Sequence, residues 1–155
     1  MGWVVVETLI LAHPQRAFDA SRDIGLHTET QKQAGEAAVA GVTTGLIGMD
    51  EEVTFEARHF GLRLQHRARI TAFDPPRRFV DTMMSGAFKS FVHEHAFEER
   101  EGGTLMIDRI ELRAPLGLLG RFAEWLFLDR YIERLQRARA LEIKAYCEAA
   151  SGEGY

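Results

Sequence analysis

The stretch SGAFKSFVHEHAFEEREGGTLMIDRIELRAP, residues 85–115, decides the fold. It holds two segments of alternating apolar and polar residues, near 90–100 and 104–114, joined by a turn at Gly102-Gly103. Alternation with a period of two is typical of a half-buried strand, and a short glycine turn joins antiparallel neighbours. The stretch therefore predicts a β-hairpin.

The first strand of this hairpin carries two histidines on one face. Because successive side chains of a strand point to opposite sides, that face consists of Phe91, His93, His95 and Phe97. The turn sets a register that places Asp108 of the second strand opposite His95. We therefore expect an imidazole and a carboxylate side by side on an otherwise apolar wall.

Such a pair can perform acid–base chemistry. A carboxylate fixes the tautomer of an adjacent imidazole and raises its proton affinity, as a general base requires. The catalytic candidates are His95, Asp108 and His93. A structural role, in which the groups satisfy each other within the core, is the alternative. If a cavity partly solvates the pair, replacing His95 and Asp108 with Leu and Asn should change ligand uptake more than stability.

The two imidazoles also raise the question of a metal site, because His93 and His95 can both reach one ion. Asp108 can supply a third ligand, but no further His, Cys or Glu clusters around the strand in the sequence. Zinc sites usually show a clearer ligand set. We therefore expect neither a metal nor another cofactor.

Outside the hairpin, the same alternation and turn residues continue along the chain. They predict five further strands, near 3–11, 37–44, 51–59, 62–73 and 79–86. His13-Pro14 ends the first strand, and two short helices follow, PQRAFDASRDIG and TETQKQAGEAA, separated near Gly25. One long helix is expected from Leu118 to Ala149. This order predicts an α+β fold in which a seven-stranded curved antiparallel sheet surrounds the C-terminal helix.

The long helix is apolar nearly all round its first half. Burial against loops, a ligand cavity on one side and a second subunit in a homodimer each explain this pattern. A cavity between sheet and helix would have aromatic walls and one polar end. The residues expected to line it are Phe88, Phe91, His93, His95, Phe97, Met106, Asp108, Phe122 and Trp125.

Length and charge restrict the class of protein. The 155 residues fit one domain, placed at 1–150, with a short flexible tail at 151–155. A net charge of −4 gives no attraction for a phosphate backbone, so we expect no nucleic-acid partner. The apolar N-terminal segment is too short to span a bilayer, so no stable membrane insertion is expected. The single Cys147 cannot form an internal disulfide, which indicates the cytoplasm.

Several motifs together resemble the START-like, SRPBCC superfamily of polyketide-cyclase type, over nearly the whole chain. The similarity is greatest to a bacterial group of ligand-binding proteins with a Gly-Pro-aromatic turn, a Trp-x-His-x-His-x-Phe strand, Thr-x-Met-x-Asp and Pro-x-Gly. The matching residues here are Gly86, Phe88, His93, His95, Phe97, Thr104, Met106, Asp108, Pro115 and Gly117. Ala87 replaces the proline and Phe91 the tryptophan, so the strand's opening and the pocket wall differ.

The resemblance implies a helix-grip fold whose deep cavity takes lipids, polyketides, hormones or other apolar ligands. Some relatives are cyclases or hydrolases and others only bind or carry, so the fold does not choose among these functions. We favour a binder of a small, largely apolar molecule. One alternative is a cyclase, dehydratase or hydrolase that uses His95 and Asp108 as an acid–base pair; the other is a protein-interaction module that uses the apolar start of the last helix. The enzyme hypothesis requires the histidines to face the cavity.

Overall fold

The computed structural model describes residues 2–32 and 35–149, with the side chain of Trp125 excepted. The expected domain end at 150 and the tail at 151–155 lie outside the described residues. The strands are β1 (Gly2–Ile10), β2 (Ala37–Gly41), β3 (Glu52–His59), β4 (Leu62–Asp74), β5 (Arg78–Ser85), β6 (Ser90–Arg100) and β7 (Gly103–Arg113). The helical segments are α1 (Pro14–Arg22), α2 (Ile24–Thr30), α3 (Gly117–Ala123), the π-helical η2 (Glu124–Leu128) and α4 (Asp129–Ala149).

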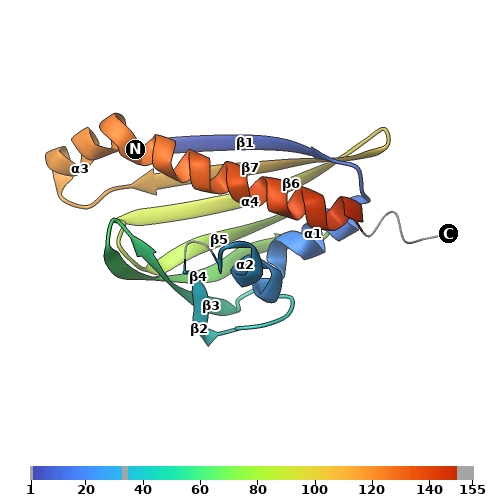
Figure 1. Ribbon diagram of the computed structural model, residues 1–155, viewed down its shortest axis with the longest axis horizontal. Helices are drawn as coiled ribbons and strands as arrows, with labels where there is room; N and C mark the ends of the chain where they lie inside the picture. Colours follow the sequence, from blue (N-terminus) through green and yellow to red (C-terminus); the bar gives the residue numbers. More distant parts are fainter. Residues whose placement is uncertain (1, 33–34, 150–155) are drawn as a thin grey trace.

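The strands form one antiparallel seven-stranded sheet in the order β1-β7-β6-β5-β4-β3-β2. Consecutive strands from β2 to β7 are neighbours. Because β1 pairs with β7, the two edge strands of the sheet are β1 and β2. Figure 1 shows α4 lying across the sheet, with α1 toward the C-terminal end of α4 and α2 below its middle, near β2 and β3. The α+β helix-grip fold expected from the sequence is confirmed.

The hairpin of β6 and β7 has the register that its glycine turn predicts. His95 pairs with Asp108, and Arg100 pairs with Gly103 at the turn. Along β6, His93, His95 and Phe97 are buried while the residues between them are partly exposed. The period-two alternation therefore identified the inward face of the strand correctly.

The two short helices differ from the expected boundaries. The division falls at Asp23, because its side chain accepts a hydrogen bond from the Leu26 backbone N–H at 3.0 Å and caps α2. The helix expected over TETQKQAGEAA was placed too late: α2 begins at Ile24 and ends at Thr30, and Ala37 already belongs to β2. A capping aspartate outweighed the glycine as a boundary signal.

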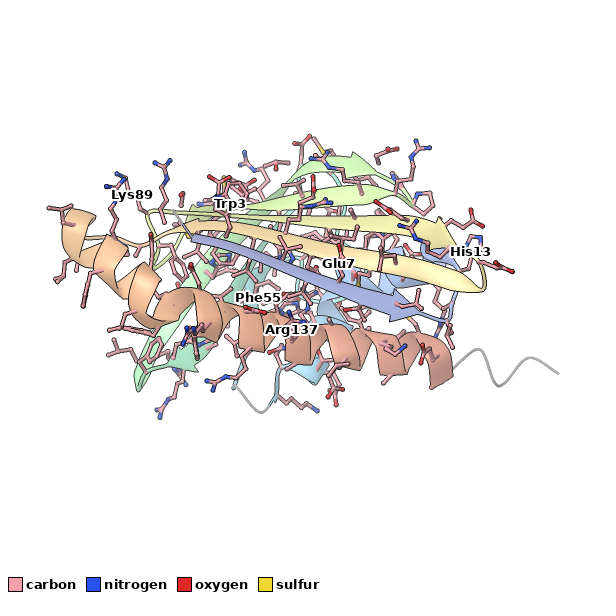
Figure 2. The ribbon with its side chains drawn as sticks, turned by 90° about the horizontal axis from the view of Figure 1, so that it is seen from above. Trp3, Glu7, His13, Phe55, Lys89 and Arg137 are labelled. Carbon is pink, nitrogen blue, oxygen red and sulfur yellow. The ribbon has the colours of Figure 1, made fainter. Side chains whose placement is uncertain are left out.

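The C-terminal helix is continuous from α3 through η2 to α4, and Figure 2 shows it running along β1. Its apolar start is not buried as the pattern suggested, because several large side chains there are close to half exposed or more: Leu118, Leu119, Phe122, Leu126 and Phe127. A second subunit against this surface stays a prediction. In the described part of the chain, no helix is both long and apolar enough to cross a membrane.

The core fills one end of the concave face of the sheet. Phe18 of α1 lies there with ring centroids 5.4 Å from Phe79 and 5.6 Å from Phe97. Ile143 and Cys147 cover it from the second half of α4. The first half of α4 faces the rest of the concave surface, where Ile132 and Gln136 meet side chains of the sheet and of α2.

Candidate ligand cavity and its polar cluster

A cavity of about 230 Å³ lies between the concave face of the sheet and α4. Its wall is mostly apolar, with side chains such as Val53 and Phe55 of β3, Ile70 of β4 and Ile132 of α4. Strands β3 to β7, both short helices and α4 all contribute to the wall. Its polar residues include one cluster on the sheet and a second group near the helix.

The polar group on the sheet is a four-residue cluster, Asp81 of β5, His93 and His95 of β6 and Asp108 of β7. His95 Nε2 lies 2.7 Å from Asp81 Oδ2, and His93 Nε2 lies 2.9 Å from Asp108 Oδ1. His95 Nδ1 is 3.2 Å from the same Asp108 oxygen. The two imidazole rings stack with centroids 3.7 Å apart. Each carboxylate therefore contacts the imidazole pair from a different side.

Contacts with the imidazoles, acting against burial, set the protonation of the two carboxylates. His93, His95 and Asp108 are 5 %, 2 % and 1 % exposed. Burial alone would raise the pKa of Asp108 and Asp81, but their contacts with the imidazoles outweigh it and hold both pKa values well below the usual range. Both carboxylates are therefore ionised at neutral pH.

The two histidines are shifted in opposite directions. Burial and the nearby charge of His95 lower the pKa of His93. Burial also opposes charge on His95, but hydrogen bonds to Asp108 and Asp81 outweigh it and raise the pKa of His95. His93 therefore resists protonation, whereas His95 takes up a proton more readily than a free imidazole, because two carboxylates face it.

The polar group near the helix centres on Arg139 and Gln136 of α4, which are 8 % and 6 % exposed and line the cavity. One guanidinium nitrogen of Arg139 donates to the Ser21 backbone oxygen at 3.0 Å. Within the described residues, Arg139 Nε and Gln136 Nε2 have no hydrogen-bond partner. Close by, His27 pairs with Glu36, and burial lowers the pKa of His27. Two buried donors without a partner in the described part of the chain therefore lie in side chains at this end of the cavity.

The structure brings together only part of the residues expected to line the cavity. Phe88, Phe91, His93 and His95 line it. Phe97 and Met106 belong to the packed core, and Asp108 lies behind the histidines. Phe122 is 56 % exposed on the helix surface, and the side chain of Trp125 lies outside the described part of the chain.

Sequence reasoning missed Asp81, Gln136 and Arg139. Asp81 pairs with His93 across β5 and β6, but the connection between these strands holds no two-residue turn that fixes a register from sequence. A signal for the helix residues did exist, because Ile132, Gln136, Arg139 and Ile143 follow the i, i+4, i+7 spacing of a buried stripe. A polar pair on that stripe indicates either a buried hydrogen-bond network or a ligand contact.

The partly solvated His95–Asp108 pair considered above is not what the structure shows, because both side chains are almost fully buried. Replacing them is therefore expected to affect the fold as well as the cavity. Three members of the cluster, Asp81, His93 and His95, also present ligand atoms within 4.8 Å of one another, which is a spacing that a metal ion could bridge.

The fold and the cavity define a helix-grip protein with an internal binding space. Residues 1–148 match the family described as polyketide cyclase / dehydrase and lipid transport, and the chain belongs to this family. The START-like, SRPBCC resemblance is thereby confirmed.

Solved structures agree on the fold. Protein Ms6760 from Mycobacterium smegmatis has a TM-score of 0.69 at 17 % identity and covers 96 % of this chain and 92 % of its own. Protein TTHA0849 from Thermus thermophilus has a TM-score of 0.66 at 16 % identity, and the match covers 93 % of this chain and 98 % of that protein. The major latex-like protein 151 from Panax ginseng has a TM-score of 0.65 at 12 % identity, and the match covers 94 % of this chain and 97 % of that protein. Comparison with curated proteins finds no match. The bacterial and cytoplasmic assignments stay predictions.

Proposed function

We propose that the protein binds a compact, largely apolar molecule in the cavity between the sheet and α4, and that this molecule carries an oxygen that accepts hydrogen bonds from Arg139 and Gln136. The observation that carries this proposal is an apolar cavity whose helix side has two buried donors with no acceptor among the described residues. A small polyketide or a short lipid with a carbonyl, phenol or carboxylate oxygen has this chemistry. Membership of the family supports the ligand class.

The size of the cavity favours a compact molecule. Its volume of about 230 Å³ is below the roughly 300–1,000 Å³ of sites for drug-sized ligands. The donors supply specificity, because leaving a buried donor without a partner costs about 1–3 kcal/mol. An acceptor on the ligand removes this cost, whereas a plain hydrocarbon leaves it in place.

Native mass spectrometry of the purified protein tests ligand binding directly. We expect a non-covalent adduct of roughly the mass of a small metabolite, lost on denaturation. The location is tested with an apolar fluorescent probe and Ala68→Phe, which places a large side chain in the cavity wall. Probe binding that is unchanged in a folded Ala68→Phe protein contradicts the cavity site.

The proposed hydrogen bond between Arg139 and an oxygen of the ligand is tested by comparing Arg139→Met with Arg137→Met. Both changes remove one guanidinium from α4, but Arg139 lines the cavity whereas Arg137 is exposed and pairs with Glu133. For a probe with a carboxylate or carbonyl group, we expect Arg139→Met to weaken binding by about 10- to 100-fold, as loss of a charge-assisted hydrogen bond does. Equal affinity in the two variants contradicts this contact.

A second candidate is an enzyme with acid–base chemistry at His95. The observation that favours it is that His95 and Asp81 both line the cavity and share a hydrogen bond of 2.7 Å, so a proton held between them lies at the cavity wall. Asp81, which also lines the cavity, joins Asp108 in orienting the ring. The test is to incubate the ligand recovered from the native protein with wild type and with His95→Gln. A product of changed structure that forms with wild type alone supports catalysis, and an unaltered ligand in both favours simple binding.

A further inference from the structure

We propose that Asp81, His93 and His95 form a three-ligand site for a divalent first-row transition metal ion, with Asp108 as the carboxylate that orients both imidazoles. This goes beyond the binding of an apolar molecule. It also reverses the expectation from the sequence, which found no third ligand except Asp108. The structure supplies a different third ligand, Asp81, from the neighbouring strand.

The first argument is the direction of the ring nitrogens. His93 Nε2 and His95 Nδ1 both point to Asp108 Oδ1, at 2.9 and 3.2 Å. The opposite nitrogens, His93 Nδ1 and His95 Nε2, are directed to Asp81 Oδ2, at 4.0 and 2.7 Å. If each ring donates its N–H to Asp108, both remaining nitrogens are lone-pair donors on the side of Asp81. Metal-binding histidines typically have this arrangement, with a carboxylate behind the ring.

The second argument is the spacing of the three ligand atoms. In a tetrahedral site with metal–ligand distances near 2.0–2.1 Å, ligand atoms lie about 3.3 Å apart. The two distances from Asp81 Oδ2, 2.7 and 4.0 Å, lie on either side of this value. A shift of the Asp81 carboxylate by less than about 1 Å equalises them.

The third argument concerns access and charge. Asp81, His93 and His95 line the cavity, and Asp108 lies behind the two rings, so the open coordination positions would face the bound molecule. Two carboxylates and one divalent ion balance in charge, which favours occupancy at a site where His93, His95 and Asp108 are almost fully buried. Two imidazoles and one carboxylate form a ligand set used by zinc and by non-haem iron(II).

The experiment titrates tag-free wild-type protein with Zn²⁺ and with Co²⁺ and measures bound metal after dialysis. We expect one ion per chain, and a Co²⁺ absorption spectrum of a four- or five-coordinate site. Asp81→Asn and His95→Ala should each weaken binding by more than about 100-fold, since loss of an orienting carboxylate alone typically costs 10- to 100-fold. Asp108→Asn should fall within that smaller range and keep the stoichiometry.

Two control variants keep the test specific. His59→Gln removes an imidazole that contacts Tyr131, not Asp81, and Glu94→Gln removes a carboxylate from the opposite face of β6. Both should bind metal as wild type does. Wild-type protein that takes up no stoichiometric Zn²⁺ or Co²⁺ overturns the proposal even if the cluster variants fail to fold. Uptake that persists in Asp81→Asn and His95→Ala also overturns it. Binding of the apolar probe to metal-free wild type is measured separately. A negative result for metal binding then does not bear on the proposed binding of an apolar ligand.

Discussion

Strands β5, β6 and β7 carry one charged cluster on each face of the sheet. On the concave face, Asp81, His93, His95 and Asp108 contact one another and are mostly buried. On the convex face, Glu94 accepts from Arg78 at 2.6 Å and from Arg109 at 2.6 Å, and the two arginine side chains are 47 % and 44 % exposed. The same strands and the same pairing therefore hold two sets of charges in different surroundings.

The difference shows that burial, more than the number of contacts, decides what a charged cluster contributes. Water and salt screen the convex cluster, so each of its ion pairs is worth about 0–1 kcal/mol. The concave cluster lacks that screening, so removing one member leaves its partners with uncompensated charge in the interior. Removing a member of the buried cluster should therefore cost much more stability than removing a member of the exposed one.

The largest difference is expected between Asp108→Ala and Glu94→Ala. Asp108→Ala removes the acceptor shared by His93 and His95 and should destabilise the protein by about 3–5 kcal/mol, as the loss of one partner from a buried pair does. Glu94→Ala should cost about 1 kcal/mol or less. Urea unfolding of both variants at neutral pH measures the two values. A cost below about 1 kcal/mol for Asp108→Ala would remove the basis of the comparison.

The fold was largely predictable because it depends on local patterns. Alternation located β6 and β7, and the turn at Gly102-Gly103 fixed their register, so His95 was placed opposite Asp108 correctly. The boundary between α1 and α2 was less predictable, because Asp23 and Gly25 are competing signals only two residues apart. Capping by Asp23 was the stronger of the two.

The site was less predictable because it depends on contacts between segments distant in sequence. Asp81 joins the histidines through the β5–β6 pairing, where bulges also shift the register of β5 against β4. The start of the C-terminal helix had three interpretations: burial against loops, a cavity, or a second subunit. Burial against loops is not what the structure shows, because α3 and η2 leave side chains such as Leu118 exposed. Residue type alone does not say how far a helix extends beyond its sheet.

The second-largest difference between the two clusters is expected in how the free energy of unfolding depends on pH. The pKa values of Asp81 and Asp108 are lowered in the folded protein, so their contribution is present above their unfolded value, near 4, and is lost as the pH falls. The pKa of His93 is also lowered, so its contribution is present above about 6.5 and is lost as the pH falls. The raised pKa of His95 acts in the opposite sense, with a contribution present below about 6.5 and lost as the pH rises.

The two histidine effects partly cancel, so we expect the steep loss of stability to begin below about pH 5. Each carboxylate contributes a slope of up to about 1.4 kcal/mol per pH unit. The measurement is the free energy of unfolding in urea at a series of pH values from acid to neutral. Asp108→Asn should reduce the slope, and Glu94→Gln should leave most of it. An equally steep acid transition in wild type and Asp108→Asn would assign it to other groups.

The smallest effect is expected for the coupling between Arg78 and Glu94 on the convex face. A double-mutant cycle with Arg78→Ala and Glu94→Ala should give about 0.2–1 kcal/mol, because both side chains are partly exposed and lose conformational freedom when they pair. Repeating the cycle in about 1 M salt, where the screening length is about 3 Å, should reduce the coupling further. The equivalent cycle with Asp81→Asn and His95→Gln should give a larger coupling that changes little with salt, because His95 is 2 % exposed. Couplings of equal size, or equal sensitivity to salt, would show that solvent screens both faces of the sheet alike, and the buried cluster would lose the property on which its proposed roles depend.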